Sequence, residues 1–451
     1  MRLYASALAG WVNPADAFAQ LHLADANAFW LDRESHSTER FSVIGAAAET
    51  HWVSDPFDWM RERTQALAAV QPADDRAASL PFSWRPGLVG ALLFEGDAAL
   101  LRVDRAMVFD HDARRMMFVG HFASQVEFDH WHHAALLRLA LVGGRLASHL
   151  HEHRIAEARP QLAASLRHDP QRYVELIESA QQHIAAGDVY QLCLTNELVV
   201  EGAPDAFAAF NRLRESSPAP YAAFLRLTTP AGELVEVASS SPEQFLGVDS
   251  TGKAVTKPIK GTRARVRGVD GAIDAKADEG MSRELRANIK ERAENLMIVD
   301  LMRNDLARVC APESVAVTKL FDVESYATVH QLVSTVSGRL ADGESAWSAV
   351  QAAFPGGSMT GAPKLRAIEI IEELEGGPRG IYSGAIGYLA ANGAADLGMT
   401  IRTIVFQGGR ASIGVGGGIT IDSNPAAELE ETKLKAKALL RSLGADDPWA
   451  V

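Results

Sequence analysis

The sequence has 451 residues, of which 47% are hydrophobic and 22% charged, and its formal net charge is −13. A chain of this length and apolar content can form a large core in one or two domains, which excludes an intrinsically disordered protein. Its excess of negative charge argues against proteins that bind nucleic acids or anionic membranes.

Neither the start of the chain nor its cysteines point to an exported or membrane protein. The opening segment, "MRLYASALAGWVNPADAF", lacks a sustained apolar run, and no segment approaches the roughly 18 apolar residues of a membrane span. Cys193 and Cys310 lie far apart and outside any CxxC pair. We therefore expect two free, buried thiols, no zinc site, no membrane association and a cytoplasmic protein.

The N-terminal part, up to about residue 125, predicts short strands separated by loops, such as "RFSVIGAAA", "PGLVGALLF" and "MMFVGHF". The segment 131–167 is rich in Ala, Leu, Arg and His, and it predicts a helix and a linker with a break at Pro160. These patterns indicate an N-terminal region at 1–150 and a second unit at 168–445.

The second unit begins with clear helix and strand signals. Asp169 is a suitable N-cap before Pro170, apolar residues recur at helical spacing from 173 to 184, and Gly187 ends the helix. Residues 190–195 then alternate between apolar and polar side chains. This alternation predicts a strand with one buried face.

More strand patterns follow at "YAAFLRLTT", "ELVEVASSS", "GIYSGAIGYLA" and "DLGMTIRTIVFQ". Long helical patterns lie at 278–309, 345–353, 363–374 and 425–441. Runs of strands with hairpin-like spacing, interrupted by helices, predict an α+β fold with packed antiparallel sheets surrounded by helices.

Two of these helical segments each carry a pair of carboxylates. Glu291 and Glu294 are three residues apart, so both project from one face of a helix. Glu428 and Glu431 repeat this spacing. If the two helices meet, their carboxylates can bind Mg²⁺, which prefers oxygen ligands and usually keeps several waters. The alternative is two solvated helix faces.

Two glycine-rich segments, 354–364 and 412–423, precede helices. Glycine lets backbone N–H groups approach an anion closely, and the N-terminus of a helix favours negative charge. The first segment ends in Gly-Ala-Pro-Lys rather than Gly-Lys-Ser/Thr, so it is no P-loop, and the second lacks GxGxxG spacing. Tight turns are the alternative for both segments.

Glu243 and Lys260 are candidates for acid–base and nucleophilic chemistry. Glu243 follows Pro242 at the end of a predicted strand, where partial desolvation would make it a general acid or base. Lys260 lies in "KPIKGTRARV" among other cations, and a lysine becomes a nucleophile when desolvation or a neighbouring cation favours its uncharged form. The alternatives are a surface glutamate and a basic loop that is solvated or holds an anionic substrate.

Eight segments, in their order and approximate spacing over residues 168–442, resemble the chorismate-utilising enzymes. They are "GDVYQLCLT", "SSPEQF", "PIKGT", "KERAENLMIVDLMRNDL", "GGSMTGAPK", "YSGAIGY", "TIRT" and "GVGGGITIDSNPAAELEETKLKAKA". The family includes component I of anthranilate synthase and of aminodeoxychorismate synthase, isochorismate synthase and salicylate synthase. The resemblance implies an anthranilate synthase component I-like fold, whose N-terminal part is interwoven with a Mg²⁺-dependent catalytic domain that acts on chorismate.

The resemblance also implies roles for individual residues. Glu243 would protonate the leaving hydroxyl and later act as a base. The metal would hold the carboxylate on the chorismate ring, with Glu294 and Glu431 as direct ligands and Glu291 and Glu428 as outer partners through water. The residues that would contact the substrate are Ser358, Thr262, Tyr382, Arg402, Gly416, Gly417, Gly418 and Lys435.

Lys260 distinguishes between branches of this family. The anthranilate and isochorismate branches usually have Ala where this chain has Lys260, whereas "PIKGT" resembles component I of aminodeoxychorismate synthase. In that branch the lysine amine attacks ring carbon 2 as the hydroxyl at carbon 4 departs. Ammonia then adds at carbon 4 and displaces the lysine, giving 4-amino-4-deoxychorismate for 4-aminobenzoate and folate synthesis. Gln191 replaces the water-activating lysine of isochorismate and salicylate synthases, which disfavours the addition of water.

The chain also departs from the family pattern. Gln331 stands where relatives have a histidine, and His330 comes one place earlier, so an acid–base role for that histidine does not carry over. The segment "FWLDRESHSTERFSVIG" resembles a tryptophan-binding strand but lacks its usual serine. Neither cysteine lies in a nucleophile-elbow context, so we expect a separate glutamine amidotransferase to supply ammonia and a separate aminodeoxychorismate lyase to act downstream.

Two other functions remain open from the sequence. In an anthranilate synthase component I, Lys260 would be a spectator and the product would be aromatic. In a catalytically silent subunit that binds chorismate or tryptophan, the acidic residues of the site would be lost. Because Glu243, Glu294 and Glu431 are all present, the sequence favours an enzyme.

Overall fold

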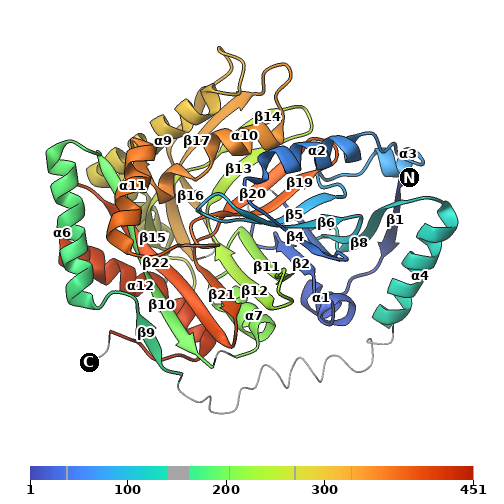
Figure 1. Ribbon diagram of the computed structural model, residues 1–451, viewed down its shortest axis with the longest axis horizontal. Coiled ribbons are helices and arrows are strands. Elements are labelled where there is room, and N and C mark those ends of the chain that lie inside the picture. Colours follow the sequence, from blue (N-terminus) through green and yellow to red (C-terminus); the bar gives the residue numbers. More distant parts are fainter. Residues whose placement is uncertain (37–38, 141–161, 203, 269–270, 327, 450–451) are drawn as a thin grey trace.

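The computed structural model describes residues 1–36, 39–140, 162–202, 204–268, 271–326 and 328–449. Its described strands form two sheets in which the paired strands are antiparallel (Figure 1). Helices lie around both sheets, so the predicted α+β class is confirmed. No helix in these ranges is long and apolar enough to cross a membrane.

The first sheet has 12 strands. In spatial order they are β1 (Arg2–Ala9), β8 (Arg115–Phe122), β7 (Arg105–Asp110), β3 (Phe41–Ala46), β2 (Ala28–Asp32), β11 (Tyr221–Thr228), β12 (Leu234–Ser241), β21 (Thr403–Gln407), β22 (Arg410–Ile419), β10 (Gln191–Glu201) and β18 (Gly361–Ala362), with β9 (Ala164–Leu166) paired to β10. The second sheet has 10 strands. They are β15 (Ile259–Ala264), β17 (Val329–Arg339), β14 (Lys253–Thr256), β13 (Gln244–Val248), β20 (Ala395–Met399), β19 (Ala385–Ala390), β5 (Gly87–Leu92), β6 (Ala98–Val103) and β4 (Thr50–Val53), with β16 (Ala316–Ser325) paired to β17.

Most of the helices cover these sheets (Figure 1). The two helices that carry the predicted carboxylate pairs come from the second half of the chain. The described helices are α1 (Pro14–His22), α2 (Pro56–Ala68), α3 (Asp75–Ala78), α4 (Gln125–Ala140), α6 (Pro170–Ala186), α7 (Ala206–Ser216), α8 (Ala275–Ala287), α9 (Ile289–Ala307), α10 (Ala346–Ala353), α11 (Lys364–Glu375) and α12 (Pro425–Leu443), with a 3₁₀ turn η1 (Gly357–Met359). Strands from before residue 150 and after residue 168 occur in both sheets.

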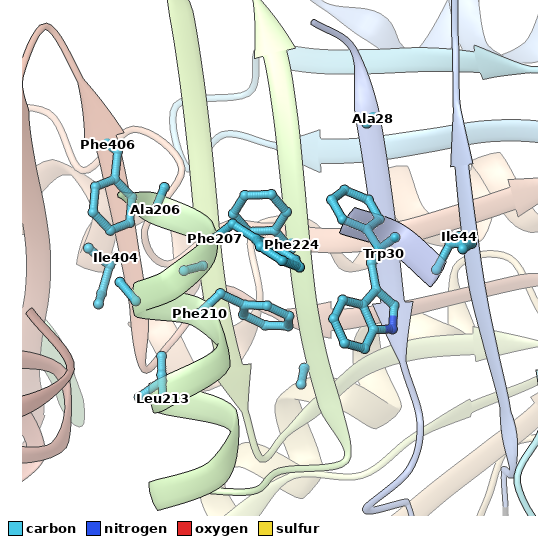
Figure 2. Packing of buried hydrophobic residues seen from close by; sticks show 14 of the residues in the cluster. Ala28, Trp30, Ile44, Ala206, Phe207, Phe210, Leu213, Phe224, Ile404 and Phe406 are labelled. Carbon is cyan, nitrogen blue, oxygen red and sulfur yellow. The ribbon is translucent and has the colours of Figure 1, made fainter. Parts of the chain in front are cut away.

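One aromatic core joins the early and late parts of the chain. Phe224 of β11 pairs with Trp30 of β2, and both are fully buried. Helix α7 lays Phe207 and Phe210 over this pair, with ring centres 5.4 Å and 5.5 Å from Phe224 (Figure 2). Each such burial contributes about 1.5–3 kcal/mol, so residues distant in sequence are held together by a shared core.

The helix termini follow the predicted chemistry. Asp169 caps α6 by accepting a hydrogen bond from the Arg172 amide at 2.8 Å, and Gly187 ends the helix in a left-handed conformation with φ 85°. Asn424 caps α12 in the same way, accepting from the Ala427 amide at 3.0 Å. These caps satisfy backbone groups that a helix leaves unpaired at its ends.

Two local predictions differ from the structure in their bounds, and one short strand was not predicted. The helix expected at 278–309 is two helices, α8 and α9, because Asn288 leaves the helical conformation and caps α9 through the Glu291 amide at 3.1 Å. Helix α4 begins at Gln125, ahead of the predicted segment 131–167, whose residues 141–161, with Pro160, lie outside the described ranges. The short strand β9 also follows there, without a strand pattern in the sequence.

Strand β10 is buried on both faces, contrary to the expected single buried face. Its polar residues Gln191 and Thr195 are 1% and 3% exposed, because their face is covered by the site and by Glu375 rather than by water. The segment 412–423 is not the tight turn that was its alternative, since most of it lies in β22, paired with β10. A methyl group on Gly416 would lie 2.1 Å from the Leu194 carbonyl oxygen, so this strand position requires glycine.

Candidate active site

Lys260 lies on β15 beside a bulge in the second sheet. Gly261 has φ +82°, and the pairing of β15 with β17 shifts register between Ile259 and Thr262. The lysine side chain reaches toward the first sheet. Its Nζ lies so close to Gly418 of β22 that a methyl group on that glycine would be 3.3 Å away. The same methyl group would lie 2.8 Å from Gln191 Nε2, so both side chains point to one place between the sheets.

The other described cations of this segment each have an ion-pair partner. Lys257 pairs with Glu324 at 3.1 Å, Arg263 with Glu284 at 2.9 Å and Arg265 with Asp278 at 2.7 Å. Within the described part of the chain, Lys260 forms neither a hydrogen bond nor an ion pair. It therefore differs from its neighbours, and a fully solvated basic loop does not describe its position.

Glu243 lies between β12 of the first sheet and β13 of the second, and only 6% of it is exposed. Burial raises the pKa of this carboxyl to about 7 from an ordinary value of 4.5, although the Lys260 ammonium and hydrogen bonds from Ser358 and the Ile259 amide oppose the rise. A surface glutamate, the alternative left open by the sequence, is excluded. A carboxyl with this pKa can donate a proton near neutral pH and take it back.

The two predicted carboxylate pairs face each other from α9 and α12. Glu294 and Glu428 are buried, with side chains 11% and 7% exposed, while Glu431 is 53% exposed. Burial raises the pKa of Glu294. Burial acts the same way on Glu431, but the Lys435 ammonium at 2.8 Å outweighs it, so the pKa of Glu431 lies below its ordinary value. Glu291 lies 3.3 Å from the Arg263 guanidinium.

The donor set of these helices fits Mg²⁺. The four carboxylates offer only oxygen, and the Lys290 ammonium lies 3.8 Å from Glu294 Oε1 and 3.5 Å from Glu428 Oε1, so a positive charge already spans the two helices. Nowhere in the described ranges do three His, Cys, Asp or Glu side chains converge into a complete metal cage.

The glycine strand β22 lies directly beside these charged groups. A methyl group on Gly417 would lie 3.2 Å from Glu428 Oε2 and 3.6 Å from Lys435 Nζ, and Lys435 donates a hydrogen bond to the Gly416 carbonyl at 2.7 Å. The structure thus brings the predicted glycines next to both Lys260 and the carboxylates. Their close approach, rather than a turn, explains why the segment is rich in glycine.

Arg402 and Tyr382 form the other side of the site. Arg402 has φ +52°, and burial lowers the pKa of its guanidinium, which acts electrostatically with Tyr382 and Glu431. Among the described residues, its side chain has no hydrogen-bond or ion-pair partner. Tyr382 packs on Gly414, where any Cβ would lie 2.0 Å from the tyrosine ring. An unpaired, largely desolvated guanidinium suits a carboxylate ligand.

Some predicted residues lie apart from this group. Thr262 is exposed on β15, opposite the buried Gln331. His330 points to the other face of β17, where it lies 3.0 Å from Asp278 and 2.8 Å from Ser325. A cavity of about 790 Å³ between α1, α4 and the strands β3 and β7 is lined by none of the predicted site residues.

Sequence reasoning missed Lys290, Glu375 and Arg379. Lys290 precedes Glu294 by four residues, the spacing of an ion pair along a helix, which is a signal that the sequence does contain. Glu375 and Arg379 are also four residues apart and form an ion pair. The sequence does not predict this pair, because Gly-Gly-Pro between them ends the helix.

The chain matches one protein family and several of its known members. Residues 27–441 match the family model described as chorismate binding enzyme. The aminodeoxychorismate synthase of Streptomyces griseus is 42% identical over 95% of this chain. This chain spans only 62% of the length of that relative. Anthranilate synthase component 1 of Streptomyces coelicolor is 35% identical over 96% of this chain and 86% of its own.

The fold matches a solved member of the same group. The crystal structure of anthranilate synthase component I from Streptococcus pneumoniae TIGR4 superposes with a TM-score of 0.70 at 28% identity, covering 89% of this chain and 92% of that one. The predicted fold is therefore confirmed.

Proposed function

The chain belongs to the chorismate binding enzyme family, and we propose that within it the chain is component I of an aminodeoxychorismate synthase, which converts chorismate and ammonia to 4-amino-4-deoxychorismate. The observation that carries this proposal is the position of Lys260, whose amine lies beside Gly418 and acts electrostatically on Glu243, Glu294 and Glu431. The name and higher identity of the Streptomyces griseus relative support the same choice.

The proposed reaction is the one that the family resemblance implies, with Lys260 as nucleophile and Glu243 as proton donor. The Lys260 ammonium first releases a proton to solvent, and its free amine then forms a bond to ring carbon 2, the ring double bonds shift, and the carbon 4–oxygen bond breaks. Glu243 gives its proton to the departing hydroxyl, which leaves as water. Ammonia then bonds to carbon 4, the carbon 2–nitrogen bond to Lys260 breaks, and Glu243 recovers a proton from the new ammonium group. Two easier substitutions replace one difficult one.

The remaining residues bind and orient the substrate. Bound Mg²⁺ would supply positive charge for the ring carboxylate, with Glu294 and Glu431 as its ligands and Glu291 and Glu428 as outer partners. The unpaired guanidinium of Arg402, with the Tyr382 hydroxyl, suits the second carboxylate. Ser358, Lys435 and the glycine strand at 416–418 complete the proposed contacts, and the exposed Thr262 is left out of them.

Ammonia and the final product require other proteins. Both cysteines are free and buried, and burial raises the pKa of the Cys193 and Cys310 thiols, so neither is a ready nucleophile for glutamine. We therefore include a separate glutamine amidotransferase and a downstream aminodeoxychorismate lyase in the proposal. Two reduced cysteines also suit a cytoplasmic setting.

Replacing Lys260 by Ala tests the proposal. Wild type incubated with chorismate and Mg²⁺ but no ammonia is expected to show an intact-mass adduct that maps to Lys260, and with ammonium salt to make 4-amino-4-deoxychorismate. Lys260→Ala is expected to lose both. Lys257→Ala is the matched control, because that lysine lies on the same segment but pairs with Glu324. An alanine variant that makes the product at the wild-type rate would contradict the proposal.

Anthranilate synthase component I is the second candidate. The observation that favours it is that this chain spans 86% of the length of the Streptomyces coelicolor anthranilate synthase component 1. Under this alternative, wild type and Lys260→Ala would both release fluorescent anthranilate directly, and no adduct would form. Product identification by mass spectrometry separates the two functions.

A further inference from the structure

Arg379 lies in the loop after α11 with its side chain 2% exposed, and it uses all five of its side-chain N–H donors. It donates to both oxygens of Glu375, at 2.8 Å from Nε and 2.6 Å from Nη2. Nη2 also donates to the Cys193 carbonyl at 2.7 Å, while Nη1 donates to the Met359 carbonyl at 2.7 Å and the Ser383 hydroxyl at 3.4 Å. The guanidinium stacks 4.4 Å from the centre of the Phe94 ring.

The three segments that Arg379 joins each carry a neighbour of the site. Cys193 follows Gln191 by two residues on β10, Met359 directly follows Ser358, and Ser383 directly follows Tyr382. Glu375 adds a further tie to β10, since its Oε1 accepts hydrogen bonds from the Thr195 amide at 2.7 Å and hydroxyl at 2.9 Å. One planar cation thus fixes the spacing of segments from β10, η1 and the start of the β19 hairpin.

We propose that Arg379, held by Glu375, is a positioning residue that keeps the Ser358 hydroxyl against Glu243 and so orients the proton donor of the reaction. The inference rests on the proposed role of Glu243. Its geometric basis is the η1 turn, where Arg379 donates to the Met359 carbonyl at 2.7 Å and the adjacent Ser358 is the residue whose hydroxyl lowers the pKa of Glu243. A lysine cannot replace this arrangement, because an ammonium has three donors and lacks the planar fork.

The alternative is that the pair only stabilises the fold. A buried ion pair is weak evidence for stability in itself, since the cost of desolvation offsets much of the attraction. The two roles make different demands on the chemistry. A purely structural pair would change the unfolding temperature alone, whereas a positioning residue would also change how the activity depends on pH.

The direction of that change follows from the surroundings of Glu243. The Ser358 hydroxyl lowers the pKa of Glu243, as does Lys260, the charged side chain that acts on it from β15. If Ser358 shifts away, the pKa of Glu243 rises and the carboxyl stays protonated to higher pH. The alkaline limb of the pH profile should then move upward by about one pH unit, the effect of losing a hydrogen bond to a charged group.

The experiment compares Arg379→Lys with Ser358→Ala and with their combination. Chorismate consumption is followed across pH, so the assay works whichever product forms. We expect Arg379→Lys to lower kcat by about a hundredfold with a smaller change in KM, and to shift the alkaline limb as Ser358→Ala does. The double variant should show no further shift, because both changes act through one hydrogen bond.

Arg214→Lys is the matched control. Arg214 is a largely buried arginine that pairs with the buried acid Asp32 and with the exposed Glu34 and stacks on Trp30, but it contacts no residue of the site. It should lose stability without a shift of the pH profile. If Arg379→Lys behaves like this control, or if its shift adds to that of Ser358→Ala, the positioning role is wrong.

A second variant covers the case in which Arg379→Lys does not fold. Thr195→Val removes one hydrogen bond to Glu375 and should shift the alkaline limb in the same direction by a smaller amount. An unchanged limb in that variant would also overturn the inference. Failure of the proposed function is recognised separately, since wild type would then give a different product or Glu243→Gln would keep full turnover.

Discussion

Glu243 owes its raised pKa to its position where the chain passes from the first sheet to the second. The chain leaves the first sheet at Ser241 and enters the second at Gln244, so Glu243 lies where two cores meet and water has little access. The resulting pKa of about 7 means that the carboxyl is protonated below neutral pH and ionised above it. Proton donation to a leaving group requires the protonated form.

From this we predict the pH dependence of the enzyme. The kcat/KM for chorismate should fall as pH rises through about 7, and Glu243→Gln should lose turnover by about a hundredfold or more at every pH. The measurement is a pH profile with ammonium in excess. A wild-type profile without this fall, or a glutamine variant with near-normal turnover, would show that Glu243 is not the proton donor.

The same raised pKa predicts that stability, like activity, falls as pH rises. The folded state holds the proton more tightly than the unfolded state, so the contribution of Glu243 to stability is lost as pH rises from about 4.5 through about 7. Glu243→Gln carries no such charge. Its thermal stability relative to wild type should therefore increase over that pH range, which gives a check independent of activity.

At the scale of elements, the helices α9 and α12 form the site only when they are brought together. Each carries its carboxylates at a spacing that was predictable, and the caps Asn288 and Asn424 orient both first turns. The contact between the helices was not predictable, because it depends on Lys290 reaching Glu428 from another part of the chain. Local patterns determine faces of helices, whereas tertiary packing determines which faces meet.

Strand β10 shows the same limit in a sheet. Its alternating sequence predicted a polar face, and the prediction that this face meets water is wrong because Gln191 and Thr195 meet the site and Glu375 instead. A period of two in a strand distinguishes its two faces but not what covers them. Polar residues at functional sites therefore look like surface residues in a single sequence.

For the helix pair we predict the effect of Glu431→Gln. The change removes one negative oxygen ligand from the proposed Mg²⁺ site, so turnover of chorismate should fall by at least about a hundredfold, and added Mg²⁺ should restore little of it. The measurement is a Mg²⁺ titration of turnover, together with a melting curve that should change little. Glu430→Gln is the control, because Glu430 lies on the same helix, is 69% exposed and pairs with Lys433.

Normal turnover of Glu431→Gln at low Mg²⁺ would contradict the metal assignment. Equal losses in Glu430→Gln and Glu431→Gln would point instead to the helix as a whole.

At the scale of the whole molecule, the order of eight motifs predicted the family and the fold class, but not how the strands pair. Gly87 of β5 lies opposite Ala390 of β19, and Trp30 of β2 opposite Phe224 of β11. No local pattern connects residues so far apart, since each strand pattern is satisfied by any suitable neighbour. The interleaving of early and late strands in both sheets follows from the packed cores that they share.

The last prediction concerns the nitrogen source of the whole chain. The purified 451-residue chain should convert chorismate with ammonium salt, but glutamine should be inactive until a partner glutamine amidotransferase is added. The physical reason is that hydrolysis of glutamine needs an activated nucleophile, whereas burial raises the pKa of both thiols of this chain. The measurement is product formation with each nitrogen source, with Cys193→Ser and Cys310→Ser as controls that should leave ammonium-dependent turnover intact. Glutamine-dependent turnover by the chain alone would show that it contains a glutaminase site of its own.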